Sequence, residues 1–281
     1  MNEIYVDTSE RLSLVINSLG IKTDADGQVN VSLTEAGSTT PIFTSIAIKD
    51  GSTPGTYYFD VPQNLVKLEI VIKVVWSFTL KGIASQKTEI LSVVTPYVYP
   101  YEFIEHNPST TLTVPEITDL ERTARAIVNA FTGQKFGQRK ETVRLYPGST
   151  GALEIRGAIV RVNSVTSYGN NNVGLIMPFS VVVPSLADTW EIKLERTNRA
   201  SYYMVEAIFG YDFVPFEVAL ATRMLMGDMS CDDSVYRRRG IQAVRAADWR
   251  LDFHDIAFRG TGNVDVDLLL SEYRFRGMVI I

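Results

Sequence analysis

The feature that most constrains this chain is an amphipathic stripe in residues 115–137. Its apolar members recur at the three- and four-residue steps of one helix face, and they are Ile117, Leu120, Ala124, Ile127, Val128 and Phe131. Thr118 or Asp119 can cap the start of this helix, and Gly133 can end it. A helix of this length is marginal alone, so the stripe must pack on something. The helices expected after residue 213 are its natural partners.

A β-hairpin is predicted directly after this helix. Its strands would span residues 142–146 and 153–165. The turn between them is rich in the residues that favour tight turns, namely Pro147, Gly148, Ser149, Thr150 and Gly151. Residues 167–204 then read as a β-rich insertion with strands at 179–183 and 190–194, and a further strand follows at 202–209. The core module is therefore expected to combine helices with a hairpin and this insertion.

Helices are predicted again near the carboxyl end. Pro215 suits a first helical position, and the apolar residues after it lie on a broad face. A second helix is expected at residues 235–249, and a last short helix at 264–273, which the loop 260–263 is expected to cap. The chain then ends in an apolar tail that would be an aggregation hazard as a free edge. Docking of this tail on a partner is favoured over a tail without a partner.

The first 95 residues read as an all-β module. Seven β-branched or alternating runs are separated by turn signals; they span residues 3–6, 11–16, 29–34, 42–48, 57–61, 65–80 and 87–94. This spacing suggests a small sandwich of immunoglobulin-like kind, with Trp76 in its core. Residues 96–114 follow as a proline-rich linker that is expected to be extended. Its alternating aromatic residues pack on one domain or, alternatively, contact a neighbouring subunit; they are Tyr97, Tyr99, Tyr101 and Phe103.

Charge argues against a general nucleic-acid binder, because the net charge is −5 and the pI is about 5.2. Residues 1–114 carry six Lys and one Arg, whereas residues 115–281 carry three Lys and seventeen Arg. Arg forms geometrically fixed ion pairs and is enriched at interfaces, so the second part is expected to meet protein partners or copies of itself. The single cysteine, Cys231, allows no internal disulfide, and no segment reads as a signal peptide or a membrane span.

No catalytic or metal-binding motif emerges, so an enzyme is not expected and no cofactor is predicted. His106 and His254 are the two histidines, and neither has metal-site spacing. The one basic cluster comprises Arg237, Arg238 and Arg239. A solvated helix face, ion pairing between subunits and phosphate contact with DNA are its three readings, in falling order of expectation.

The order of segments in residues 115–281 resembles the head–tail connector, or neck adaptor, proteins of tailed bacteriophages. The segments that carry the resemblance are residues 122–128, 132–137, 143–146, 162–165, 210–215 (Gly-Tyr-Asp-Phe-Val-Pro) and 268–274. The N-terminal sandwich lies outside the resemblance and looks like an added decoration domain. The implied class is α+β with two domains, at 1–95 and 115–281.

The resemblance implies a structural virion protein at the phage neck, in a ring of twelve copies that joins portal to tail and extends the DNA channel. Genomic DNA would pass without sequence-specific binding, and a downstream neck or tail protein would be a further partner. The portal-docking segment would comprise Tyr273, Arg274, Phe275, Arg276, Met278, Val279, Ile280 and Ile281. Arg237, Arg238, Arg239 and Arg245 would lie at the subunit interface, and Pro147, Gly148, Ser149 and Thr150 would face the channel or tail. A tail terminator, baseplate or fibre-attachment protein is the alternative.

Overall fold

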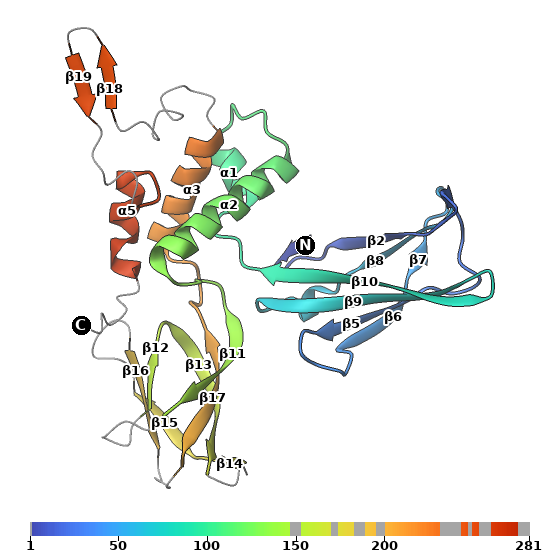
Figure 1. The fold of residues 1–281 in the computed structure, drawn as a ribbon, viewed down its shortest axis with the longest axis horizontal. Coiled ribbons are helices and arrows are strands. Elements are labelled where there is room, and N and C mark those ends of the chain that lie inside the picture. The colour runs from blue at the N-terminus through green and yellow to red at the C-terminus, as the bar shows by residue number, and fades with distance from the viewer. Residues whose placement is uncertain are drawn as a thin grey trace. The chain divides into compact units, whose positions relative to one another are not determined.

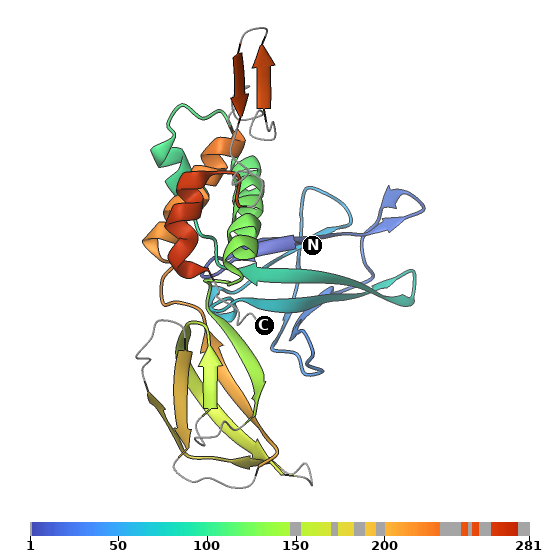
Figure 2. The ribbon, with the colours of Figure 1, turned by 60° about the vertical axis from the view of Figure 1, so that its left-hand side comes forward.

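The fold is a mixed α+β structure, as the sequence predicts. A computed structural model describes residues 2–146, 153–169, 174–182, 189–194, 200–230, 243–246, 249–252 and 260–274. The chain divides into two compact units, Met1–Thr95 and Pro96–Ile281 (Figure 1, Figure 2). The first unit is built of strands, and the second combines helices with strands.

The first unit has two main sheets. The larger has the strand order β1-β10-β9-β5-β6, and the smaller has the order β2-β8-β7. Strands β3 and β4, which follow β2 in the sequence, form a separate short pair. A 3-10 turn, η1 (Gln63–Leu65), precedes β9. The bounds are β1 (Asn2–Tyr5), β2 (Arg11–Val15), β3 (Asn17–Ser18), β4 (Ile21–Lys22), β5 (Asn30–Glu35), β6 (Phe43–Ile46), β7 (Ile48–Lys49), β8 (Thr56–Asp60), β9 (Ile70–Leu80) and β10 (Ile83–Val94).

One hydrophobic core lies between these sheets, and the alternation of each strand supplies it. Leu12 and Leu14 of β2 and Val74 and Trp76 of β9 are almost completely buried, while their neighbours in the strands are more exposed. The prediction of an all-β module with Trp76 in the core is therefore confirmed. The predicted strand at residues 42–48 is divided between β6 and β7, which belong to different sheets, and the buried Ala47 lies between them.

The second unit contains a layer of helices. These are α1 (Pro100–His106), α2 (Val114–Thr132), α3 (Phe216–Ser230) and α5 (Val264–Leu270), with the 3-10 turn η4 (Ser271–Tyr273) directly after α5. Helix α3 packs on both α2 and α5, and α1 packs on α2 (Figure 1). The predicted stripe of α2 is confirmed, since Ile117, Ala124 and Val128 are fully buried against α3 and α5.

Most of the remaining second unit is a β module, whose strands come between α2 and α3 in the sequence. One sheet has the order β11-β17-β13-β14 and the other β12-β16-β15. The bounds are β11 (Arg139–Leu145), β12 (Leu153–Arg156), β13 (Ile159–Tyr168), β14 (Gly174–Ile176), β15 (Phe179–Val182), β16 (Thr189–Leu194) and β17 (Tyr202–Phe209). Both sheets bury residues in one core, among them Leu153, Val165, Ile192 and Val205.

The predicted hairpin at residues 142–165 is wrong. Strand β11 pairs with β17, more than fifty residues later, and β12 pairs with β16. The turn residues favour a reversal of the chain, but burial of one face of each sheet in their shared core selects partners that a local pattern does not contain. The segment predicted as an insertion supplies β14, β15 and β16, which complete these two sheets.

The predicted cap of α2 is also wrong. The helix begins at Val114, so Thr118 lies within it and its hydroxyl donates to the Val114 carbonyl at 2.9 Å. Thr113 is the N-cap, and both its backbone N–H and its hydroxyl donate to Glu116 Oε2 at 2.7 Å. Pro115 is tolerated at the start because the first backbone N–H groups have no partner within the helix. Gly133 ends the helix in the left-handed conformation, as predicted.

Two further predictions fail in the described residues. The segment predicted as an extended linker contains α1, which begins at Pro100, and it buries Tyr97 and Phe103 in the helical core. The helix predicted at residues 235–249 is contradicted at its end, because β18 (Ala243–Ala246) pairs with β19 (Trp249–Asp252). Residues 231–242 lie outside the described part of the chain.

Candidate functional site

The candidate site is the root of the carboxyl-terminal segment, where η4 leaves the helical layer. Tyr273 lies in an aromatic cluster with Phe136, Tyr211 and Tyr97. The ring centroids of Phe136 and Tyr273 are 5.6 Å apart with an edge contact, and those of Phe136 and Tyr211 are 5.5 Å apart and stacked. Tyr97 contacts the same Phe136 ring edge-on at 5.6 Å. This cluster holds the last described turn of the chain against the end of α2.

Polar contacts fix the same residue from two sides. The Tyr273 hydroxyl donates to Glu217 Oε2 of α3 at 2.9 Å, and its carbonyl oxygen accepts from Gln134 Nε2 at 2.7 Å. The Arg274 guanidinium lies 5.3 Å from the centre of the Phe131 ring. Residues 273 and 274, the last described ones, are therefore held by contacts to α2, to the segment directly after it and to α3.

Electrostatics at this root favour a neutral tyrosine beside a carboxylate. Burial and then the hydrogen bond to Glu217 raise the pKa of Tyr273 to about 12. The Glu217 backbone N–H and the Tyr273 hydroxyl hold the pKa of Glu217 below its usual value. The pair is therefore in its bonded state at neutral pH.

The loop before α5 is organised so that this short helix can form. Asn263 caps α5, since its side-chain oxygen accepts from the backbone N–H groups of Asp265 and Val266. Its amide nitrogen donates to Asp228 Oδ2 at 2.8 Å, which ties the start of α5 to the end of α3. Asp267 Oδ1 accepts from the backbone and the hydroxyl of Thr261. The predicted role of this loop in capping the last helix is confirmed.

Arginine and tyrosine side chains, of the kind enriched at protein interfaces, gather at the end of the β module that carries Tyr146. The Arg144 guanidinium lies 3.6 Å from the centre of the Tyr202 ring, and Tyr202 stacks on Tyr168 with ring centroids 5.0 Å apart. Tyr146 and Ile176 are 66% and 76% exposed. The predicted channel or tail-facing residues Pro147, Gly148, Ser149 and Thr150 follow Tyr146 directly but lie outside the described residues.

Other predicted site residues fall largely outside the described part of the chain. Arg245 lies on β18, and Tyr273 and Arg274 lie at the root described above. The residues outside the description are Arg237, Arg238, Arg239, Phe275, Arg276, Met278, Val279, Ile280 and Ile281. The sequence did not point to Gln134 or Glu217, the partners of Tyr273, because no local pattern joins residues 56 and 139 positions apart.

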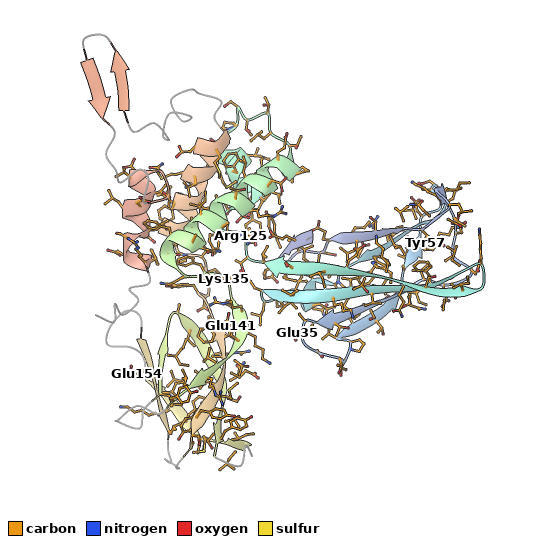
Figure 3. The ribbon with its side chains drawn as sticks, viewed as in Figure 1. Glu35, Tyr57, Arg125, Lys135, Glu141 and Glu154 are labelled. Atoms are coloured by element: carbon orange, nitrogen blue, oxygen red, sulfur yellow. The ribbon has the colours of Figure 1, made fainter. Side chains whose placement is uncertain are left out.

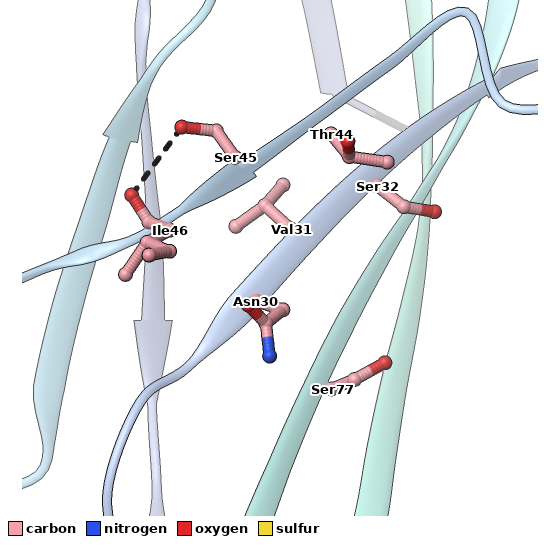
Figure 4. A pocket seen from close by; sticks show the side chains of 7 residues that line it. All are labelled: Asn30, Val31, Ser32, Thr44, Ser45, Ile46 and Ser77. Atoms are coloured by element: carbon pink, nitrogen blue, oxygen red, sulfur yellow. Dashed lines mark hydrogen bonds between the residues drawn. The ribbon is translucent and has the colours of Figure 1, made fainter.

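Surface grooves lie among the described residues. One groove of about 610 Å³ lies between the end of α2 and the β module, and Lys135 and Glu141 line it (Figure 3). Another, of about 650 Å³, lies on the first unit and is lined by small side chains around Asn30 and Ser77 (Figure 4). The latter has no titratable lining residue. Among the described residues, no cluster of His, Cys, Asp or Glu could hold a metal ion, and no helix is long and apolar enough to cross a membrane.

Comparison with known proteins adds little to this geometry. No family model matches the chain, and no curated protein matches it. A solved structure described as the neck of an empty GTA particle computed with C6 symmetry is similar over 66% of this chain and 93% of its own. The TM-score is 0.41 and the sequence identity is 12%, so this likeness carries no argument about function.

Proposed function

We propose that this chain is a structural protein of a tailed phage-like virion, located in the neck between head and tail. Copies of the chain form a ring, of twelve as the resemblance implies, that joins the portal to the tail and extends the DNA channel. The proposal rests on the family resemblance of residues 115–281. It assigns the chain a structural role and no catalysis.

One structural observation supports the docking role in this proposal: the root of the carboxyl-terminal segment is bonded to the helical layer, and the sequence after it is short and apolar. Tyr273 is bonded to Gln134 and Glu217 and packed on Phe136. Phe275 to Ile281 follow this anchored turn directly in the sequence. An apolar carboxyl end of this composition suits docking into a groove or onto a sheet edge of another protein, here the portal.

The charge of the protein is consistent with a DNA channel. Phosphate contacts dominate nucleic-acid affinity, so a protein with net charge −5 would hold passing DNA only weakly. In this proposal residues 147–150 face the channel or the next tail component. Arg237, Arg238, Arg239 and Arg245 serve the subunit interface, and the first unit is an immunoglobulin-like decoration.

The test is electron microscopy of virions in which the first unit carries a fused label. The expected result is label density in a ring at the neck, directly below the portal. Density at the tail tip would contradict the proposal and favour the alternative of a baseplate or fibre-attachment protein, and the additional all-β unit is the feature that favours this alternative. Density at the end of the tail tube that meets the head would identify a tail terminator.

A matched pair of variants tests the docking role. Deletion of residues 275–281 leaves Tyr273 and its contacts in place, so the helical layer is expected to fold while attachment to portal-bearing heads is lost. A Leu19→Ser variant changes an exposed residue of the first unit, which is 96% accessible, and serves as the control. Unchanged attachment of the deletion variant would show that the tail does not dock.

A further inference from the structure

The helical layer carries large apolar side chains on two of its outer faces. The first group, here called the α5 patch, lies on α5 and the entry to α3, and it comprises Phe213, Phe216, Val264 and Leu268. These side chains are 87%, 69%, 52% and 67% exposed. Val264 and Leu268 are four residues apart and so share one stripe of α5. The bond between Tyr273 and Glu217 holds the end of α5 beside the first turn of α3.

The second group, here called the α1 patch, lies on α1 and the first turn of α2. Tyr101, Ile104 and Val114 are 64%, 38% and 55% exposed. Tyr101 is stacked on Tyr99 with ring centroids 5.6 Å apart, so its position is fixed. Phe103, on the other side of α1, is buried in the core, so the outward position of this patch follows from the helical period.

The two patches lie on opposite sides of the layer. Helix α3 contacts α5 and α2, and α1 contacts α2. Figure 1 shows α5 to the left of α3 and α1 to its right. One partner of a different kind would need only one of these patches. Two different patches, on helices at opposite ends of the chain of contacts α1–α2–α3–α5, fit a head-to-tail contact between copies, because each copy then buries both.

The area of the two patches is sufficient for such a contact. Their seven side chains expose roughly 800 Å², if a whole aromatic side chain offers ~150–250 Å². A standard interface buries about 1,200–2,000 Å² in total, of which a little over half is non-polar. The patches therefore supply about the apolar area of one complete contact.

We infer that the α5 patch of one copy packs on the α1 patch of the next copy, and that this heterologous contact builds the ring. The inference rests on the proposed function, which it deepens by naming the two faces of each subunit. It assigns the apolar part of the subunit contact to these helix faces, in addition to the arginine contacts proposed above.

The test uses the full chain and two double variants. One variant, Phe216→Ser with Leu268→Ser, removes the α5 patch, and the other, Tyr101→Ser with Ile104→Ser, removes the α1 patch. All four residues are exposed, so both variants are expected to fold, which helix circular dichroism checks. Leu19→Ser removes an equally exposed apolar residue of the first unit and is the control.

Sedimentation and native mass spectrometry at roughly 100 µM are the readout, because interfaces of this size bind in the micromolar range or more tightly. The wild type and Leu19→Ser are expected to form higher oligomers, and each double variant alone is expected to be monomeric. An equal mixture of the two double variants retains one intact pair of patches, so it should form dimers that grow no further.

Other outcomes overturn the inference. A wild type that stays monomeric, a double variant that still forms higher oligomers, or a mixture without dimers would each exclude the head-to-tail contact. The proposed function fails separately. A chain that forms these oligomers but is located at the tail tip leaves the inference standing, whereas a chain at the neck whose variants assemble normally leaves only the proposed function.

Discussion

The first unit and the helical layer of the second unit bury their aromatic residues differently. In the first unit, Trp76 is fully buried between the two sheets, and Tyr57 and Phe59 are almost as deeply buried. In the helical layer, Phe103 and Phe136 are buried, but Phe213 and Phe216 are 87% and 69% exposed. The described first unit exposes aliphatic residues such as Leu19 and Ile21 but none of its large aromatic ones, whereas the helical layer leaves aromatic surface uncovered.

This difference indicates where each part of the molecule gains its stability. Removing an apolar side chain from a closed core lowers the free energy of unfolding of a single chain. Removing one from an exposed face changes the unfolding free energy of the single chain little and instead weakens the association of copies. Paired substitutions in the two regions can therefore separate folding from assembly.

The largest effect is expected for Trp76→Ala. Loss of this buried side chain leaves a cavity in the core of the first unit and should lower its unfolding free energy by about 3–5 kcal/mol. Amide hydrogen exchange of β9 and β10 measures this, because both strands cross that core. The matched substitution Phe216→Ala is expected to change the unfolding free energy of the dilute monomer, measured from its helix signal, by less than about 0.5 kcal/mol. Equal destabilisation by both would remove the contrast between the two regions.

The next effect concerns the junction of α2 with the β module. Gly210 has φ +110°, and an added Cβ would lie 2.3 Å from the Gly137 carbonyl oxygen. Gly157 has a similar φ of +102°, but an added Cβ there meets nothing within 4 Å. Gly210→Ala should therefore cost on the order of 3 kcal/mol or more, whereas Gly157→Ala should cost about 1–2 kcal/mol from backbone strain alone.

Thermal unfolding followed at 222 nm measures both glycine variants, since the helices belong to the second unit. The comparison is informative because the two positions share the backbone conformation and differ in the space around them. If both variants melt at the same temperature, the close backbone approach of residues 137 and 210 contributes nothing beyond the conformation itself.

The same two regions differ in how well the sequence predicts them. Most strands of the first unit pair with neighbours nearby in sequence, as β9 does with β10, and local alternation locates them. In the second unit, β17 pairs with both β11 and β13, so its sheet depends on contacts across dozens of residues. Strand positions were predictable there, but strand partners were not.

The candidate site shows the same limit. The apolar tail and the last helix could be identified from residue types, and so could the loop 260–263 that caps this helix. The anchor of Tyr273 could not, because Gln134 and Glu217 are ordinary polar residues in the sequence. They become important only when packing of α2, α3 and α5 brings them to one place.

A smaller effect tests the start of α2, where the structure corrected the sequence-based cap. Thr113→Ala removes the hydroxyl that donates to Glu116 and should cost about 1 kcal/mol of helix stability. The matched variant is Thr118→Ala, whose hydroxyl bonds to the Val114 carbonyl within the helix and is expected to matter less. Melting at 222 nm ranks the two, and a larger loss for Thr118→Ala would favour the cap predicted from the sequence.

The pH dependence of the helix melting temperature gives a second measurement at this cap. The Thr113 backbone N–H, and then its hydroxyl, hold the pKa of Glu116 below its usual value of 4.5. The stabilisation is therefore fully present above pH 4.5 and is lost as the pH falls through the lower, folded-state pKa. Thr113→Ala should reduce the acid dependence of the helix melting temperature, and Thr118→Ala should leave that dependence unchanged.

The smallest effect at neutral pH is expected at the root of the carboxyl-terminal segment, and alkali should enlarge it. The pKa of Tyr273 is raised to about 12, so the folded chain holds its proton more tightly than the unfolded chain, where a tyrosine titrates near 10. This contribution to stability is complete below pH 10 and is lost as the pH rises towards 12. Tyr273→Phe has no proton to lose, so its helix melting temperature should fall less between pH 10 and 12 than that of the wild type.

Tyr101→Phe, at an exposed ring, is the control and should follow the wild type. If Tyr273→Phe also follows the wild type, the hydroxyl does not anchor this turn, and the position of Tyr273 would depend on the aromatic contacts to Phe136 and the Gln134 bond alone.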